Sequence, residues 1–261
     1  MTFKPANKDE QLNLLTAIRK KLLAEIVNRP NLLMQIVHIE PLGVKEAIGD
    51  PAPYKDFALQ RGEERLTEAT IIGFKGQAFT SYPCRWRGTL DEALNLSLDS
   101  EKNRAIFVAT ANALGRLLNL CDRTIHCKDQ GPDKCGREMA EYIASQFGSE
   151  INIGIIGYQP AIVKHMVNFF GNDRVFVTDL NPDNIGNEVF GVKILNGSSC
   201  LVELAKNCHI GLITGSTLIN GTLNEILDVF KEYGVKPYIY GTTAALPPKI
   251  LGIERLCFEA I

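Results

Sequence analysis

Apolar residues near the start of the chain recur at helical spacing and then gather in short runs. Between Asn7 and Asn28 they lie three or four residues apart, which predicts a helix that ends before Pro30. The apolar residues of this helix are Leu12, Leu15, Ile18, Leu22 and Ile26. Short apolar runs then predict three strands, at Leu32 to Ile39, Val44 to Ile48 and Ala69 to Phe74. A polar stretch from Asp50 to Arg65 precedes the third strand, and we expect an antiparallel meander.

Helical spacing returns after these strands. The predicted helices cover Leu90 to Leu96, Asn103 to Leu118 and Asp133 to Phe147. A helix, three strands and a group of helices in that order are typical of an α+β domain. We therefore expect residues 1–147 to form an N-terminal α+β domain.

The second half of the chain alternates between strands and helices. Predicted strands cover Ile151 to Gly157, Arg174 to Asp179, Val192 to Leu195, His209 to Thr214 and Pro237 to Tyr240. Predicted helices between them end at Phe170, Lys206 and Tyr233. Such alternation gives a parallel sheet with right-handed crossovers. The fold class is therefore α/β, with a Rossmann-like parallel-sheet domain over residues 148–261 and a boundary near Gly148.

The glycines after the first of these strands form an incomplete nucleotide-binding fingerprint. Gly157 follows the strand, but the dinucleotide pattern needs glycines where this chain has Gln159 and Ile162. A tightly held NAD or FAD is therefore not expected, and the cofactor stays open. Pro160 suits the first turn of a helix, and the free amides of that turn favour an anionic or polar ligand group.

Four strands of the predicted sheet end in polar or glycine-rich loops. Because the carboxyl ends of parallel strands share one edge, these loops should lie together and form a ligand site. The candidate ligand-binding residues are Gly157, Tyr158, Gln159, Asn181, Gly215, Ser216, Thr217, Asn220, Gly241, Thr242 and Thr243, with Asp179 as the acid–base or ribose-binding candidate. The alternative is that these residues cap helices, and that Asp179 is a polar residue that ends a strand.

Two polar residues lie within the most apolar helix of the first half. Thr110 and Asn112 belong to a run that is apolar nearly all round, so the helix should be buried. An unpaired buried Asn costs about 1–3 kcal/mol. These side chains therefore either tie the helix to neighbouring backbone or face a ligand in an interdomain cleft, of which this helix would be the opposite wall.

Composition narrows the classes of partner. The chain has 261 residues, seven cysteines and a formal net charge of −2. It has no basic tract, so nucleic acid is not an expected partner. No apolar run reaches the ~20 residues of a membrane span, and the N-terminus lacks the apolar core of a signal peptide. We expect a cytoplasmic protein without membrane insertion, with free thiols; a homo-oligomer stays open.

Four motifs in their order resemble a known family. GYQP follows the first strand of the second half, DLNP the second, GSTLINGT the fourth, and GTTAALPP lies near the end. They resemble the heavy-metal chelation family of bacteria and archaea, described as an enolase N-terminal-like domain followed by a Rossmann-like domain. TANAL, Thr110 to Leu114, resembles the helix motif of that first domain. The resemblance implies a site between the domains that acts on pterin-, flavin- or siderophore-like molecules or on metals.

Protein ligands for a metal are not evident in the sequence. No C-x-x-C, H-x-x-x-H or H-E-x-x-H pattern exists, so we expect no built-in metal site and interpret Cys135 as core packing. The chelation attributed to the family then refers to a chelator molecule or to the genomic company of the family, not to side-chain ligands, and the expected partner is a polar small molecule or metal chelate. Nucleophile elbows and phosphate loops are also missing. An enzyme of the interdomain cleft, a non-catalytic binder of a metal complex or metabolite, and an S-adenosylmethionine-dependent methyltransferase stay open as functions.

Overall fold

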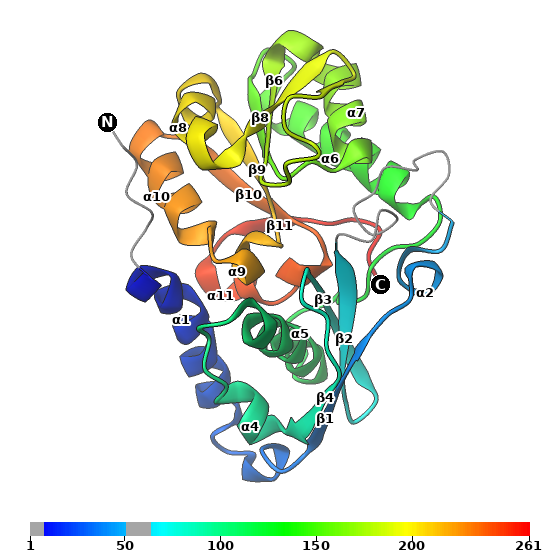
Figure 1. Cartoon of the computed structure of the whole chain (residues 1–261), viewed down its shortest axis with the longest axis vertical. Coiled ribbons are helices and arrows are strands. Elements are labelled where there is room, and N and C mark those ends of the chain that lie inside the picture. Colours follow the sequence, from blue (N-terminus) through cyan, green and yellow to red (C-terminus); the bar gives the residue numbers. More distant parts are fainter. Residues whose placement is uncertain (1–7, 51–63) are drawn as a thin grey trace.

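The chain folds around two β-sheets. The structure, a computed structural model, describes residues 8–50 and 64–261 (Figure 1). A four-stranded sheet has the order β3-β2-β1-β4, and a seven-stranded sheet has the order β11-β10-β9-β5-β6-β8-β7. The predicted α/β class is therefore confirmed, with a small antiparallel sheet and a larger, mostly parallel one.

The small sheet differs from the predicted meander. Its strands are β1 (Ile36–Pro41), β2 (Arg65–Ile71), β3 (Phe74–Thr80) and β4 (Trp86–Thr89). β1 pairs antiparallel with both β2 and β4. The predicted strand from Ala69 to Phe74 spans the turn between β2 and β3, and neither β3 nor β4 was predicted. The predicted strand at Val44–Ile48 is wrong, because these residues form helix α2. Val44, Ala47 and Ile48 recur at helical spacing, and the last two are buried.

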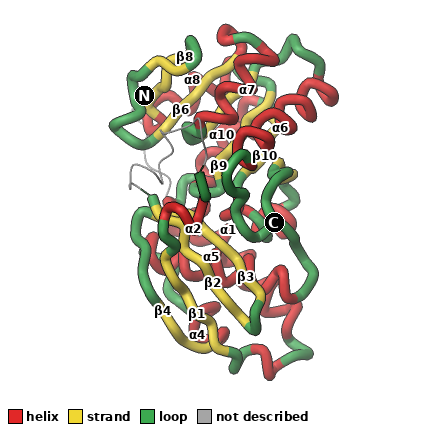
Figure 2. Tube along the Cα trace, turned by 90° about the vertical axis from the view of Figure 1, so that its right-hand side faces the viewer, coloured by secondary structure: helices red, strands yellow, loops and turns green. Residues whose placement is uncertain are grey.

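Helices cover one face of the small sheet. These are α1 (Lys8–Ile26), α4 (Leu90–Leu94) and α5 (Glu101–Leu117), and the 3-10 turn η1 (Pro30–Leu32) precedes β1. Leu15, Ile18, Leu22 and Ile26 of α1 are buried as predicted, while the side chain of Leu12 lies outside the described part. β1 buries Val37 and Ile39 and exposes Ile36, His38 and Glu40, so no described helix covers its second face (Figure 2). Residues 51–63 of the predicted polar stretch lie outside the described residues.

Strand β3 lies unusually close to helix α5. A Cβ atom on Gly76 would overlap the backbone nitrogen of Ala113 and would lie 2.6 Å from the carbonyl oxygen of Ala109. Only glycine permits this approach. The helix is buried along most of its length, from Ala105 to Gly115.

The large sheet has the predicted parallel arrangement. Its strands are β5 (Ile153–Ile156), β6 (Val175–Asp179), β7 (Glu188–Val189), β8 (Val192–Asn196), β9 (Ile210–Thr214), β10 (Lys236–Tyr240) and β11 (Glu254–Leu256). β5 lies between β6 and β9 and is parallel to both. Only the edge strand β7 is antiparallel among the described strands of this sheet.

Helices cover both faces of the large sheet. α6 (Gly131–Phe147) and α7 (Pro160–Phe170) share one core with β5 and β6, and α8 (Gly197–Asn207) and α10 (Leu223–Tyr233) belong to the other. The shorter helical elements are η2 (Asn172–Arg174), α9 (Thr217–Asn220), η3 (Thr242–Ala244) and α11 (Pro247–Leu251). α6 precedes Gly148 yet packs on the large sheet, and the domain boundary at Gly148 stays a prediction. No described helix is long and apolar enough to span a membrane.

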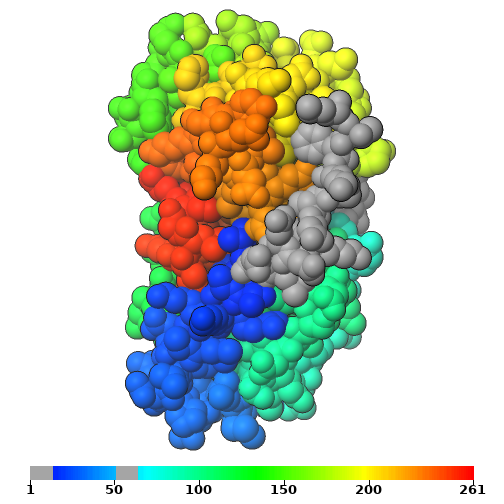
Figure 3. All heavy atoms as spheres, turned by 90° about the vertical axis from the view of Figure 1, so that its left-hand side faces the viewer, coloured from blue at the N-terminus to red at the C-terminus, as the bar shows by residue number. Residues whose placement is uncertain are grey.

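The two halves of the chain interlock rather than meet at one linker. α1 contacts α10 and α11, and Figure 3 shows its blue atoms against the orange and red C-terminal segments. η3 packs against β3 and α5. At the C-terminus, Ile261 and Ile125 exchange two backbone hydrogen bonds of 2.9 Å each. The first half therefore contacts the C-terminal part of the chain through α1, through β3 and α5, and through Ile125.

Replacing Gly76 by alanine should separate β3 from α5. We expect Gly76→Ala to lower the free energy of unfolding by about 1–3 kcal/mol, because the added methyl group meets backbone atoms that side-chain rotation cannot move. Urea denaturation followed by circular dichroism measures this change. Gly43→Ala is the control: Gly43 has a φ of −65°, and nothing lies within 4 Å of its added Cβ atom. Equal stability of the two variants would contradict the close contact.

Candidate functional site

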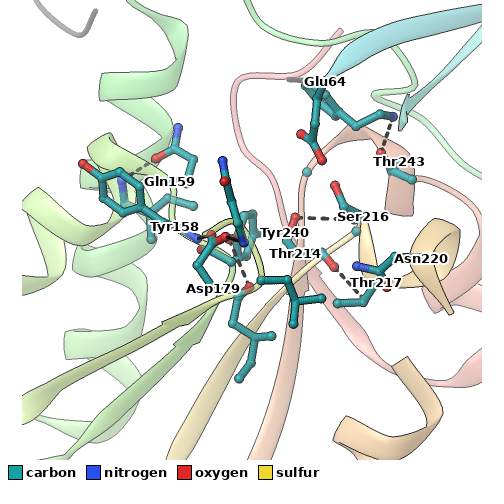
Figure 4. A pocket seen from close by; sticks show the side chains of 18 of the residues that line it. Glu64, Tyr158, Gln159, Asp179, Thr214, Ser216, Thr217, Asn220, Tyr240 and Thr243 are labelled. Atoms are coloured by element: carbon teal, nitrogen blue, oxygen red, sulfur yellow. Dashed lines mark hydrogen bonds between the residues drawn. The ribbon is translucent and has the colours of Figure 1, made fainter. Parts of the chain in front are cut away.

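A cavity of about 730 Å³ lies where the carboxyl edge of the large sheet faces the first half of the chain. The loops after β5, β6, β9 and β10 line it from one side (Figure 4). From the other side it is lined by the end of β3 with Phe79, Thr80 and Ser81, and by His126 and Cys127. The loops predicted to share one edge therefore do converge.

The loop after β5 is held close to its neighbours. Gly157 has a φ of +94°, and a Cβ atom there would lie 2.6 Å from Cγ2 of Thr214. The Tyr240 hydroxyl donates a hydrogen bond of 2.8 Å to the Gly157 carbonyl, and burial raises the pKa of this phenol, so it stays a donor. The Gln159 side chain accepts from the Ile162 amide at 2.6 Å. Gln159 is therefore a helix cap that also lines the cavity.

Asp179 joins two of the loops. One carboxylate oxygen accepts from the Tyr158 amide at 2.5 Å, and the other accepts from the Asn181 amide at 2.6 Å. Figure 4 shows the side chain between Tyr158 and Tyr240 at the centre of the site. Each oxygen already accepts a hydrogen bond from a backbone N–H group. Holding the two loops in place therefore explains the presence of Asp179 without a ligand. This geometry favours the structural alternative over an acid–base role.

The loop after β9 contains both satisfied and available polar groups. Thr217 donates from Oγ1 to the Thr214 carbonyl at 2.7 Å. Asn220 accepts from the Thr222 hydroxyl at 2.8 Å and from its amide at 3.1 Å. The Ser216 hydroxyl makes no capping hydrogen bond, and Figure 4 shows it directed toward Glu64 and the open part of the site. Gly215 packs so closely on η3 that a Cβ atom would lie 2.9 Å from the Ala244 nitrogen.

The loop after β10 connects the cavity to the first half of the chain. Thr243 accepts a hydrogen bond of 2.9 Å at Oγ1 from the Phe79 amide of β3. The neighbouring Thr242 is fully buried and lines the cavity, and its hydroxyl has no hydrogen-bond partner among the described residues. Gly241 accepts at its carbonyl from Arg255 at 3.1 Å. Thr242 therefore has a buried hydroxyl without a described partner in the wall of the cavity.

Thr110 and Asn112 lie outside the cavity lining. The Asn112 amide nitrogen donates to the carbonyls of Gln77 at 2.9 Å and Thr243 at 3.0 Å, and its oxygen accepts from the Leu246 amide at 2.9 Å. This corrects the expectation that this part of the helix forms the opposite wall, because of the described residues of α5 only Glu101, at its beginning, lines the cavity. Asn112 ties α5 to neighbouring backbone, which was the first of the two alternatives.

Four acidic residues line the cavity, of which the sequence reasoning identified only Asp179. The others are Glu64, Glu101 and Glu225, and no lysine or arginine lies among the described lining residues. Partial burial raises the pKa of Glu225, which is in the first turn of α10. The sequence could have indicated Glu225, because an acidic residue there follows the loop after a predicted strand. Acidic residues are also common where helices begin, so this position alone does not predict a cavity residue.

His126 is a neutral imidazole in the opposite wall. Burial lowers its pKa to about 4, and its ring packs edge-on against Phe79 at 5.3 Å between centroids. Nδ1 lies 2.6 Å from the Cys127 carbonyl oxygen. Because a carbonyl only accepts, Nδ1 carries the proton and Nε2 keeps its lone pair. His126 has no catalytic or metal-binding motif around it in the sequence, so its place in the cavity wall was not predicted.

Three thiols line the same wall of the cavity, namely Cys127, Cys135 and Cys257. Interpreting Cys135 as core packing was therefore incomplete, because one side of α6 faces the cavity. All seven cysteines are free thiols. Among the described residues, no group of three or more His, Cys, Asp or Glu side chains is arranged to hold a metal ion.

Comparison with known proteins finds a family match within the second half of the chain. Residues 143–255 match the model of the DUF364 family, whose description is "Putative heavy-metal chelation". Over these residues the chain is similar to the DUF364 family. The match confirms the resemblance read from the four strand-end motifs, all of which lie within it. No curated protein matches the chain.

Solved structures of DUF364 proteins align with most of this chain. One is a protein of unknown function from Pyrococcus horikoshii, with 17% identity and a TM-score of 0.52 over 91% of this chain and 82% of that one. Another, from Desulfitobacterium hafniense, has 14% identity and a TM-score of 0.46 over 72% of each chain. At this identity the first likeness establishes the fold alone.

Removing the Asp179 carboxylate should destabilise the protein. We expect Asp179→Ala to lower the free energy of unfolding by about 1–3 kcal/mol, because two partly buried backbone amides lose their acceptor. Asp179→Asn keeps one acceptor oxygen and should lose less. Thermal unfolding measures both, with the exposed Asp183→Ala from the same loop as the control. An unchanged melting temperature for Asp179→Ala would restore a purely ligand-binding role.

His126 should make stability depend on pH. Since folding lowers its pKa from 6.5 to about 4, the unfolded chain binds the proton first as pH falls, and stability is lost between about pH 6.5 and 4. His126→Asn keeps a donor for the Cys127 carbonyl but does not titrate, so the free energy of unfolding should depend less steeply on pH in this range. Urea denaturation at several pH values measures the slope. The same substitution at the exposed His38 is the control, and parallel slopes for wild type and His126→Asn would refute the assignment.

Proposed function

We propose that the protein binds a polar nitrogen heterocycle of the pterin or flavin class in this cavity and transfers a proton to or from it through Glu225. The observation that supports this most directly is the Thr242 hydroxyl, which is fully buried, has no partner among the described residues and belongs to a residue that lines the cavity. A buried hydroxyl without a partner costs about 1–3 kcal/mol. A ligand that completes its hydrogen bonds recovers that free energy.

The size and lining of the cavity suit such a ligand. A volume of about 730 Å³ lies within the range of about 300–1,000 Å³ common for small-molecule sites. Apolar side chains such as Ile156, Ile162, Leu201 and Met139 alternate with the polar loops around it. A flat ring with a polar edge matches a lining of this kind.

The charges of the lining favour a ligand edge that donates hydrogen bonds. Carboxylates accept two parallel hydrogen bonds from adjacent N–H groups, and a pterin ring carries such a pair in its amino group and neighbouring ring nitrogen. Glu64, Glu101 and Glu225 face the cavity with Asp179. Recognition of an anionic ring, which the helix amides alone had suggested, has less support than recognition of a donor-rich or cationic one.

Glu225 is the best-placed group for proton transfer. Its carboxylate lines the cavity, and partial burial raises its pKa above the usual value of a glutamate, a direction that suits a general acid or base. Asp179 is less suited, because both of its oxygens accept backbone hydrogen bonds. A positioned acid or base contributes about 10²–10⁴-fold to a rate.

A non-catalytic role in binding a metal complex is the second candidate. The description of the DUF364 family as heavy-metal chelation favours it. No group of three described metal-ligating side chains surrounds a common point, so a metal would arrive inside its own chelator, such as a siderophore-like molecule. The acidic lining would then attract a cationic complex.

Binding and turnover separate the two candidates. Ligands that co-purify are identified by mass spectrometry, and a panel of pterins, flavins and ferric siderophores is tested by calorimetry. We expect Thr242→Val to weaken binding of a pterin or flavin by about 1–3 kcal/mol, because the methyl group that replaces the hydroxyl makes no hydrogen bond. Glu225→Gln should still bind this ligand but lose turnover by about 10²-fold or more.

The exposed Glu232→Gln, from the same helix, is the control for charge and stability. Binding of a ferric chelate without turnover, unaffected by Glu225→Gln, would support the second candidate instead. If neither variant changes the binding of any ligand found, the ligand does not occupy this cavity.

A further inference from the structure

Two of the cavity thiols form a close pair. Cys135 lies in α6 and Cys257 directly follows β11, so 122 positions of sequence separate them. The Cys135 sulfur nevertheless accepts a hydrogen bond of 3.5 Å from the amide of Phe258, the residue that follows Cys257, so the two thiols lie close together. Both line the cavity, and each is 8% exposed. A small molecule that enters the cavity can therefore reach the pair.

The surroundings of Cys257 stabilise a thiolate. The Cys135 thiol donates to its sulfur, the Arg255 guanidinium lies nearby, and the backbone amides of Ala260 and Gly241 also point to it. Together these contacts lower the pKa of Cys257, with the hydrogen bond from Cys135 as the largest cause, although burial acts in the opposite direction. The thiolate is the reactive form of cysteine.

The neighbouring thiols differ from Cys257. The hydrogen bond to Cys257 raises the pKa of Cys135, and burial adds to the effect. Burial raises the pKa of Cys127 to about 12, and the nearby Cys257 and Glu259 add to this shift. Burial alone raises the pKa of Cys208, outside the cavity, to about 12. Only one thiol of the cavity is thus prepared to act as a nucleophile, and its hydrogen-bond donor is a second thiol.

We propose that Cys257 and Cys135 form a redox-active dithiol that reduces a hydroperoxide entering the cavity. This activity goes beyond the proposed binding of a heterocycle and does not depend on it. In the first step the Cys257 thiolate attacks one peroxide oxygen. A sulfur–oxygen bond forms, the oxygen–oxygen bond breaks, and the leaving oxygen takes a proton to give water or an alcohol.

The second thiol completes the reaction. The Cys135 sulfur attacks the sulfur of the Cys257 sulfenic acid, a disulfide forms and the sulfur–oxygen bond breaks. The hydroxide released takes the proton of Cys135 and leaves as water. Two thiols are thereby oxidised by two electrons, and one hydroperoxide is reduced. An external thiol restores the dithiol by exchange.

The decisive measurement is selective thiol labelling of the wild-type protein. We expect iodoacetamide at pH 7 to label Cys257 at least tenfold faster than Cys208, which is equally exposed at 8% but lies outside the cavity. One equivalent of hydrogen peroxide should then remove two titratable thiols, and peptide mapping should find a disulfide between Cys135 and Cys257. Equal labelling rates, or a peroxide-treated protein that keeps both thiols, would overturn the proposal.

Variants separate the roles of the two sulfurs. Cys135→Ser should let the Cys257 sulfenic acid accumulate, so that dimedone traps it, whereas Cys257→Ser should abolish rapid peroxide consumption. Cys208→Ser is the matched control and should react like wild type. If the cavity variants do not fold, wild-type labelling still decides. A disulfide between Cys257 and Cys127 would overturn the assignment of Cys135. Unchanged heterocycle binding in Cys257→Ser would show that the dithiol is not needed for the proposed binding of a heterocycle.

Discussion

The arrangement of the two sheets depends on one buried amide. Asn112 is the residue of α5 through which β3 and the segment from Thr242 to Leu246 are joined, because its single side chain donates to both backbones and accepts from the second. No apolar residue could do this, since the carbonyls and the amide would remain buried without partners. The cavity exists because this contact fixes the loop after β10 against β3. Thr243, which accepts from the Phe79 amide, reinforces the same junction.

The sequence predicted the large sheet well and the small one less well. The apolar runs of β5, β6 and β9 are each followed by glycine or polar residues, so their length and order were readable. Val44–Ile48 has both strand-like composition and helical spacing, and a run of five residues cannot decide between them. β4 was missed because its four residues include Arg87 and Gly88, and pairing with the distant β1 stabilises it.

The candidate site was predicted in position but only partly in chemistry. Strand ends share an edge in any parallel sheet, so Tyr158, Asp179 and Ser216 could be grouped from the sequence. The opposite wall could not, because His126 and Cys257 come to the cavity through long-range packing that no local pattern encodes. The partners of Asp179 were equally hidden, since backbone amides leave no trace in the side-chain sequence. The sequence thus predicts where the loops lie, but it does not predict which of their polar atoms are left without a hydrogen-bond partner and can bind a ligand.

The pairing of Ile261 with Ile125 has a practical consequence for handling the protein. The two hydrogen bonds hold the last residue against the segment that carries His126 and Cys127, only four positions after Cys257. An affinity tag or fusion partner attached after Ile261 would start at this bridge and could pull on the cavity wall. The beginning of α1, at Lys8, lies on a different part of the surface (Figure 1). Protein for ligand screening is therefore better prepared without an extension after Ile261.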